Sequence, residues 1–196
     1  ELKNVPSYFP SLKDLQIMKV GVEKWCFNSA SLTRVEMREC PDLMKLNWGV
    51  NLDVPFHYLE EVSLNYFPKL VEWVEGVGAD VSLSSASTSD PRSEIFPRLE
   101  KLEIKNCSEL KNVPSYFPSL KDLQIMKVGV EKWCFNSASL TRVEMRECPD
   151  LMKLNWGVNL DVPFHYLEEV SLNYFPKLVE WVEGVGADVS LSSAST

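Results

Sequence analysis

Long apolar runs and clusters of basic residues are both missing from this chain of 196 residues. A membrane-spanning helix needs roughly 20 consecutive apolar residues, and no run approaches that length, so we expect no membrane partner and no signal peptide. Lysines and arginines total 20 against 28 aspartates and glutamates, which gives a net charge of −8. Because nucleic-acid phosphates are bound by clustered lysine and arginine, this composition also argues against a nucleic-acid partner.

Motifs that carry catalysis or hold metals are equally scarce. The two histidines, His57 and His165, are copies of each other in the segment VPFHYLEEV, and the cysteines lack the paired C-x-x-C spacing of a zinc site. Neither a G-x-S-x-G elbow nor a phosphate-binding G-x-x-x-x-G-K-[ST] loop is present. Adjacent glutamates such as Glu60 and Glu61 project to different sides of a strand, which indicates solvated charge. We therefore expect no enzyme activity, no cofactor and no metal site.

Cysteine is present in an odd number, five, which argues against a closed disulfide framework. Cys40, Cys107 and Cys148 occupy one common position of the repeat described below, and we expect them to be small buried thiols. Cys26 and Cys134 belong to a Trp-Cys-Phe segment on the opposite side. Reduced cysteines are typical of a cytoplasmic protein.

A recurring apolar pattern organises the rest of the chain. From Leu99 to Leu110, the sequence LEKLEIKNCSEL alternates apolar and charged residues at its centre, which predicts a short half-buried strand. L-x-x-L-x-L-x-x-C-x-x-L is the leucine-rich-repeat signature, in which stacked turns bury a common core. The pattern begins at Leu12, Leu32, Leu59, Leu99, Leu120, Leu140 and Leu167.

These units predict the fold. We expect an α/β repeat, a leucine-rich-repeat solenoid with a parallel concave sheet and a convex side made mostly of loops or 3₁₀ turns. Its strands are predicted near residues 15–17, 35–37, 62–64, 102–104, 123–125, 143–145 and 170–172.

Aromatic residues are expected to pack inside and on the convex side of this solenoid. Phenylalanine lies three residues before a first leucine at Phe9, Phe56, Phe96, Phe117 and Phe164, and serine takes that place at Ser29 and Ser137. Identical positions of successive turns come into contact, which predicts a stacked phenylalanine row. Six tryptophans are read as convex-side packing in preference to a ligand cage; they are Trp25, Trp48, Trp73, Trp133, Trp156 and Trp181.

The chain also contains a second repeat that is longer than the leucine-rich unit. Residues 1–88 recur without change as residues 109–196, with 20 residues between them. We expect residues 1–196 to form one domain in which the two copies have the same structure. The chain opens in mid-repeat and stops in a serine-rich loop, so it is interpreted as part of a longer protein. Uncapped first and last strands would then favour end-to-end self-association.

The segments FPRLEKLEIKNCSEL, RECPDLMKL, FPSLKDLQI and FPKLVEW resemble the leucine-rich-repeat domain of plant intracellular disease-resistance receptors. These are the nucleotide-binding leucine-rich-repeat proteins, and the coiled-coil subclass is the most similar. The resemblance covers essentially the whole chain, but the nucleotide-binding domain of that family is not part of it.

The resemblance implies a function. It implies a sensor that binds a pathogen effector or a host target protein and restrains the nucleotide-binding switch of the parent chain in the cytoplasm. Two alternatives stay open. The chain could be a non-catalytic adaptor scaffold, such as a substrate-recruiting repeat of a ubiquitin ligase, or an engineered or duplicated repeat with no partner of its own.

The predicted binding surface is the concave face, where residues between the core positions point outward. Its mixed charge suits recognition of a protein partner, and it also suits a merely solvated scaffold. The residues that we expect to bind a protein there are Gln16, Arg34, Glu36, Arg38, Lys101, Glu103, Lys105, Gln124, Arg142, Glu144 and Arg146.

A flexible loop is predicted at about residues 75–94, EGVGADVSLSSASTSDPRSE, because glycine, serine and aspartate dominate it. We expect limited proteolysis to cut the chain there first. Shortening the loop should leave the fold intact, since closure of a loop costs only about 0.6 kcal/mol more per doubling of its length. First cleavage within 99–125, with the loop protected, would contradict this expectation.

Overall fold

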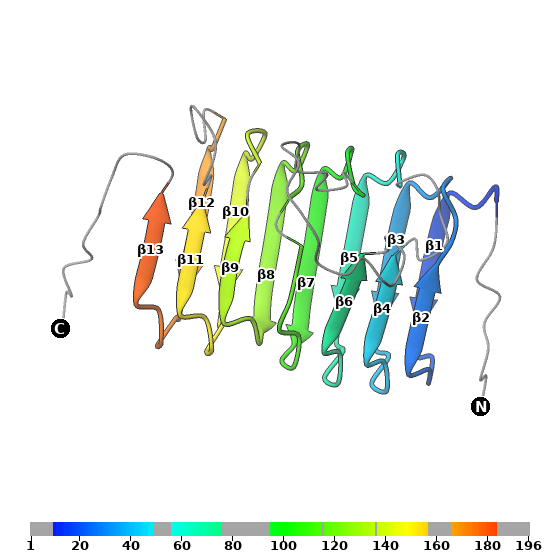
Figure 1. The fold of residues 1–196 in the computed structure, drawn as a ribbon, viewed down its shortest axis with the longest axis horizontal. Helices are drawn as coiled ribbons and strands as arrows, with labels where there is room; N and C mark the ends of the chain where they lie inside the picture. The colour runs from blue at the N-terminus through cyan, green and yellow to red at the C-terminus, as the bar shows by residue number, and fades with distance from the viewer. Residues whose placement is uncertain are drawn as a thin grey trace, which may run out of the picture.

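The computed structural model describes residues 10–48, 56–75, 95–114, 116–135, 137–156 and 166–183. The described residues form strands and turns, with no α- or 3₁₀-helix among them. The strands build one seven-stranded and two three-stranded sheets, and every pairing is parallel. Figure 1 shows them side by side in sequence order along the long axis of the molecule.

The seven-stranded sheet confirms the predicted parallel strands at their predicted positions. Its spatial order is β1-β3-β5-β7-β8-β10-β12. Each strand therefore lies beside the strand of the next repeat unit along the chain. The strands are β1 (Asp14–Met18), β3 (Arg34–Arg38), β5 (Glu61–Asn65), β7 (Lys101–Cys107), β8 (Asp122–Val128), β10 (Arg142–Arg146) and β12 (Glu169–Asn173).

The other side of the molecule carries strands where loops or 3₁₀ turns were expected, and that expectation was wrong. One sheet has the order β2-β4-β6 and the other β13-β11-β9. Their strands are β2 (Lys24–Phe27), β4 (Lys45–Trp48), β6 (Glu72–Glu75), β9 (Lys132–Phe135), β11 (Lys153–Trp156) and β13 (Glu180–Glu183). Four residues alone carry too little periodicity to predict a strand; their backbone groups become ordered because the equivalent segments of neighbouring turns pair with them.

One continuous set of buried side chains fills the space between the sheets. Val35 and Met37 of β3 and Leu46 and Trp48 of β4 are fully buried members of it. The Trp48 ring stacks on Phe27 with centroids 4.0 Å apart and on Trp73 at 5.0 Å. The described tryptophans therefore contribute to the core, as the packing interpretation predicted.

The predicted phenylalanine row is present in the middle of the molecule. The ring centroids of Phe56 and Phe96 are 5.9 Å apart, and those of Phe96 and Phe117 are 6.0 Å apart. Ser137 takes the equivalent place one turn later, where it is buried and its hydroxyl donates to the carbonyl oxygen of Leu120 at 2.9 Å. Phe9 and Phe164 lie outside the described residues.

The Phe-Pro-x-Leu motif forms a tight turn before a strand. The Leu99 amide donates to the Phe96 carbonyl at 3.4 Å, and the Leu120 amide donates to the Phe117 carbonyl at 3.2 Å. Proline suits the second position of such a turn because its ring presets φ. The cysteine version of the motif, Cys40-Pro41-Asp42-Leu43, closes in the same way at 3.2 Å.

Every strand of the large sheet has a left-handed residue next to its last residue, a feature that the sequence did not predict. The φ angles lie between 51° and 68°, and glycine occupies none of these positions; the residues are Lys19, Glu39, Tyr66, Asn106, Lys127, Glu147 and Tyr174. Such a conformation is unfavourable for residues with a Cβ. The Glu39 amide donates to the Asn65 carbonyl at 2.9 Å, so the bend continues the pairing to the next turn.

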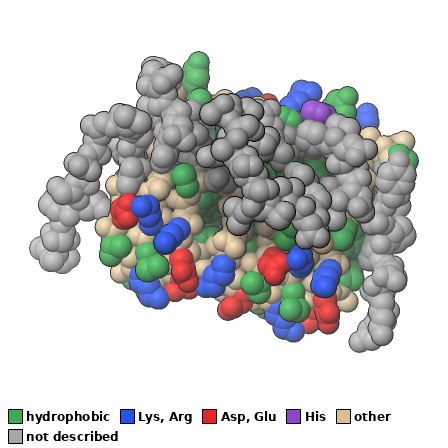
Figure 2. Space-filling model, in the orientation of Figure 1, with side chains coloured by type: hydrophobic (Ala, Val, Ile, Leu, Met, Phe, Trp, Pro, Cys, Tyr) green, Lys and Arg blue, Asp and Glu red, His purple; other side chains and the backbone are tan. Residues whose placement is uncertain are grey.

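The predicted loop over 75–94 lies outside the described residues, apart from Glu75 at the end of β6. Acidic and basic side chains are interspersed over the described part of the face seen in Figure 2. No helix in the described ranges has the length and apolar character needed to cross a membrane.

Identical sequences do not have identical environments, contrary to expectation. Val62 in β5 is 1% exposed, whereas its copy Val170 in β12 is 46% exposed. The reason is that β5 lies between β3 and β7, while β12 is the edge strand of the described sheet.

This pair of valines offers a matched test of core packing. We expect Val62→Ala to lower the free energy of unfolding by about 2 kcal/mol, because two buried methyl groups and their packing are lost. Val170→Ala should cost less than half as much. Urea unfolding of both variants measures the difference, and equal losses would show that β12 is covered in solution.

Candidate functional site

Alternation along each strand of the seven-stranded sheet divides its side chains between two faces. In β3, Val35 and Met37 point into the core, and Arg34, Glu36 and Arg38 lie on the opposite side. The parallel register aligns equivalent residues of successive strands. The result is a polar surface of three rows, called the outer face below.

The three rows contain every predicted binding residue. The row at the strand starts is Asp14, Arg34, Glu61, Lys101, Asp122, Arg142 and Glu169. The middle row is Gln16, Glu36, Ser63, Glu103, Gln124, Glu144 and Ser171. The row at the strand ends is Met18, Arg38, Asn65, Lys105, Met126, Arg146 and Asn173.

Two arginines connect three strands each. Arg34 on β3 lies 3.9 Å from Asp14 on β1 and 3.1 Å from Glu61 on β5. In the second copy, Arg142 on β10 lies 3.7 Å from Asp122 and 3.1 Å from Glu169. Loss of hydration lowers the pKa of the Arg142 guanidinium, but the negative charges of Glu169, Asp122 and Glu144 raise it by more. The net result is a raised pKa.

Glutamates of the middle row are each held by basic residues of their own strand. Glu144 lies 2.8 Å from Arg142 and 3.0 Å from Arg146. Its side chain is only 18% exposed, so the two arginines compensate for part of its lost hydration. Exposed ion pairs contribute at most about 1 kcal/mol each. Their main effect is to hold the charged groups of the outer face in a set arrangement.

The central strand β7 differs from the two copies around it. Lys105 lies 3.2 Å from Glu103, and its ammonium also donates to the Gln124 side-chain oxygen at 3.2 Å. The Ser63 hydroxyl donates to Glu103 at 3.4 Å. Lys101, at the start of the same strand, has no carboxylate within 4 Å in the part of the chain that the structure describes.

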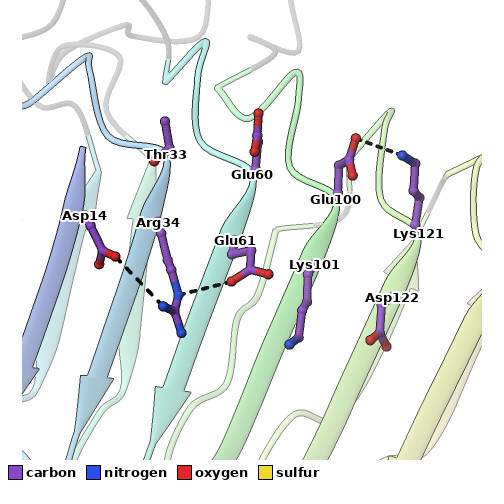
Figure 3. Close-up of a pocket in the computed structure, with 9 residues that line it drawn as sticks. All are labelled: Asp14, Thr33, Arg34, Glu60, Glu61, Glu100, Lys101, Lys121 and Asp122. Carbon is purple, nitrogen blue, oxygen red and sulfur yellow. Dashed lines mark ion pairs between the residues drawn. The ribbon is translucent and has the colours of Figure 1, made fainter.

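An open hollow lies at the start of five adjacent strands. Its volume is about 410 Å³, and it is lined by Asp14, Thr33, Arg34, Glu60, Glu61, Glu100, Lys101, Lys121 and Asp122 (Figure 3). Glu100 pairs with Lys121 at 2.8 Å, and Glu60 lies 3.8 Å from Arg98. Carboxylates outnumber basic groups in this lining, so the hollow is acidic overall, and it contains the Lys101 ammonium, which forms no ion pair with any described residue.

Of the residues that line the hollow, Arg34 and Lys101 are among the binding residues predicted from the sequence, and Glu61 and Asp122 belong to the same predicted row. Glu60, Glu100 and Lys121 stand one position before a strand, where the sequence pattern predicts neither face. A polar residue directly before each strand of the seven-stranded sheet, charged at all of these positions except Thr33 and Thr141, was the signal that could have drawn attention to them.

The neighbouring carboxylates Glu60 and Glu61 do not share a partner in the described part of the chain. Glu60 lies before β5 and Glu61 pairs with Arg34, so the two neighbouring carboxylates have separate partners. Within the described ranges, no three histidine, cysteine, aspartate or glutamate side chains are grouped to hold a metal ion. His57 is exposed in a turn, and His165 lies outside those ranges.

The three repeat-position cysteines are buried free thiols. Burial raises the pKa of Cys107 to about 12 and that of Cys148 to about 11, and it also raises the pKa of Cys40. A thiol that stays protonated at neutral pH is a poor nucleophile. Cys26 and Cys134 are only half-buried, and the Asn47 side-chain amide donates to the Cys26 sulfur at 3.3 Å.

The edges of the large sheet bear on the expected self-association. β1 and β12 each have one neighbour in the described sheet. Inside the sheet Glu61 lies beside Lys101, but pairing of β12 with β1 of another copy in the equivalent register would place Glu169 beside Asp14. Like charges opposite each other weaken strand pairing. End-to-end association stays a prediction that this register opposes.

No family model, no curated protein and no solved structure matches this chain.

The cysteines yield a pH-dependent prediction. Thiols of the unfolded chain ionise near pH 9.0, whereas Cys107 in the folded chain stays protonated up to about 12. The raised pKa means that stability is intact below pH 9 and falls as pH rises from 9 toward 12. The free energy of unfolding, measured in urea, should fall between pH 7 and pH 10. This fall should be about 1 kcal/mol smaller in Cys107→Ala than in the unchanged chain.

A disulfide-exchange reagent provides an independent measure on the folded chain. At pH 8 it should modify Cys26 and Cys134 well before Cys40, Cys107 and Cys148. Rapid modification of Cys107 without unfolding would contradict the burial described above.

Proposed function

We propose that this chain is a leucine-rich-repeat solenoid that serves as the protein-recognition, or sensor, part of a plant intracellular immune receptor. The fold part of the proposal is supported by parallel strands stacked in sequence order and by the leucines at 0% exposure in each described inner turn, such as Leu59, Leu99 and Leu120. The Phe-Pro-x-Leu turns are those on which the resemblance to the receptor family is based.

The observation that carries the functional part is the outer face. It presents three aligned rows of side chains from seven strands, all polar except Met18 and Met126, and ion pairs hold many of them in place. A preorganised surface loses little side-chain freedom when it binds, and its interspersed charges favour a partner of complementary pattern. A pathogen effector or a host target protein fits such a surface better than a small molecule, because the hollow is wide and open.

The same proposal assigns a second partner, the nucleotide-binding domain of the parent receptor, which the sensor would hold inactive in the cytoplasm. Activation would follow from competition between effector and that domain for the repeat surface. The sensor itself would carry out no chemistry.

A second candidate is favoured by one specific observation, the unchanged recurrence of residues 1–88 as 109–196. An engineered or recently duplicated repeat would have that identity and need no partner of its own, as would an adaptor scaffold whose outer face is merely solvated. Ion pairs that satisfy each other within the face, such as those of Glu144, are compatible with this alternative.

Charge reversal on the outer face separates the candidates. The double variant Arg38→Glu and Arg146→Glu changes equivalent exposed positions in both copies. The matched control, Lys24→Glu and Lys132→Glu, changes exposed positions on β2 and β9 of the opposite side. Each protein would be incubated with extracts of healthy and infected leaves, cross-linked and analysed by mass spectrometry.

We expect the unchanged chain and the control to cross-link an infection-dependent protein through the outer face, with several-fold loss in the outer-face variant. Cross-links spread over both sides, or equal capture by all three proteins, would refute recognition by this face. Equal unfolding midpoints in urea would establish that the variants remain folded.

A further inference from the structure

The row at the strand starts alternates in charge across the whole sheet. From β1 to β12 it reads Asp14, Arg34, Glu61, Lys101, Asp122, Arg142 and Glu169. An alternating row of this kind can satisfy every basic residue from its two neighbours. Arg34 and Arg142 are satisfied in this way, each by an acid on either side.

Lys101 is the exception, although Glu61 and Asp122 lie beside it in register. Glu61 is held by Arg34 at 3.1 Å. Asp122 lies 3.7 Å from Arg142 and accepts a hydrogen bond from Gln124 at 3.1 Å. Each acid therefore forms its ion pair with an arginine on the strand that lies away from Lys101. Figure 3 shows the Lys101 side chain lying between them with no ion pair drawn to it.

Lys101 is also the one member of this row that the duplication does not repeat. It lies in residues 89–108, which separate the two identical copies. Arg34 and Arg142 are equivalent positions of those copies. Any property of the unpaired ammonium therefore belongs to the junction and occurs once in the described sheet.

The surroundings restrict what can bind this ammonium. The hollow above it is open and has a volume of about 410 Å³. Its excess of carboxylates would repel a free dianion such as inorganic phosphate. A single carboxylate accompanied by basic groups would be accepted, because Glu60 is 50% exposed and its one ion pair with a described residue is the long 3.8 Å contact to Arg98.

We propose that Lys101 anchors an acidic side chain of the protein partner, and that a basic side chain flanking that acid pairs with Glu60 at the rim of the hollow. The partner segment would thus carry an acid next to a base, complementary to the ammonium and carboxylate that the junction presents. This inference rests on the proposed function of the outer face in protein recognition.

A double-mutant cycle with short peptides tests the pairing directly. The probes are the blocked synthetic peptides KGEGK and KGQGK, which differ only in the central carboxylate, and inorganic phosphate serves as a third probe. Each is titrated into the isotopically labelled full chain and into its Lys101→Met variant, with binding followed by NMR shifts of residues that line the hollow. Lys132→Met on β9 is the matched control.

We expect KGEGK to bind the unchanged chain about threefold or more tightly than KGQGK, as for an exposed ion pair. The preference for KGEGK should be lost in Lys101→Met and kept in Lys132→Met. It should also be present in Lys101→Arg, because the positive charge is retained there. Glu60→Gln should weaken KGEGK and KGQGK alike, because both retain the flanking lysines.

The inference would be overturned by equal binding of the two peptides, by a preference that survives Lys101→Met, or by phosphate binding in place of peptide binding. Absence of shifts with KGEGK at about 10 mM would do the same, since it sets the affinity below that of the weakest specific contacts. The two proposals can fail separately. Cross-linking through the outer face without peptide coupling refutes only the role of Lys101, and coupling without cross-linking refutes only protein recognition.

Discussion

A repeated backbone hydrogen-bond pattern joins each turn of this chain to the next. The carbonyl of Lys13 accepts the amides of Thr33 and Arg34, and the carbonyl of Thr33 then accepts those of Glu60 and Glu61. The same two-to-one arrangement continues through later turns as far as Glu169. Because each turn takes its register from the previous one, a slip at any point would misplace every later side chain. The core and the outer face both depend on this ladder.

The ladder has consequences on each side of the large sheet. Inward, it places equivalent leucines and aromatic rings in contact, so that Phe56, Phe96 and Phe117 form a row. Outward, it aligns charged residues of opposite sign. Parallel sheets usually have both faces covered, whereas this one presents a polar face on one side. Cross-strand ion pairs of Arg34 and Arg142 accompany that exposure and order the charges.

A distinction within the outer face follows from the duplication. Arg34 and Arg142, which are copies of each other, have equivalent ion pairs. The junction strand β7 supplies residues without a counterpart, and its Lys101 lies between two acids that are already engaged. Repeated units therefore provide a uniform scaffold, and the single unrepeated strand provides the local departure from it. Under the proposed function, recognition specificity arises where the uniform pattern is interrupted.

The sequence by itself determined the parallel strands of the large sheet, because the alternation of Leu102, Glu103 and Ile104 and its recurrences carry the two-residue period of a half-buried strand. It also determined which side chains share the outer face. Only the tertiary structure decided the strands that contain Trp25, Trp48 and Trp73, since four-residue segments become strands when neighbouring turns pair with them. It alone decided that Val62 is buried and Val170 is not, because burial depends on which strand lies alongside and not on the residue. The lack of an ion pair between Lys101 and any described residue was decided in the same way: the sequence places acids beside it, but the directions those acids take are set by their other neighbours.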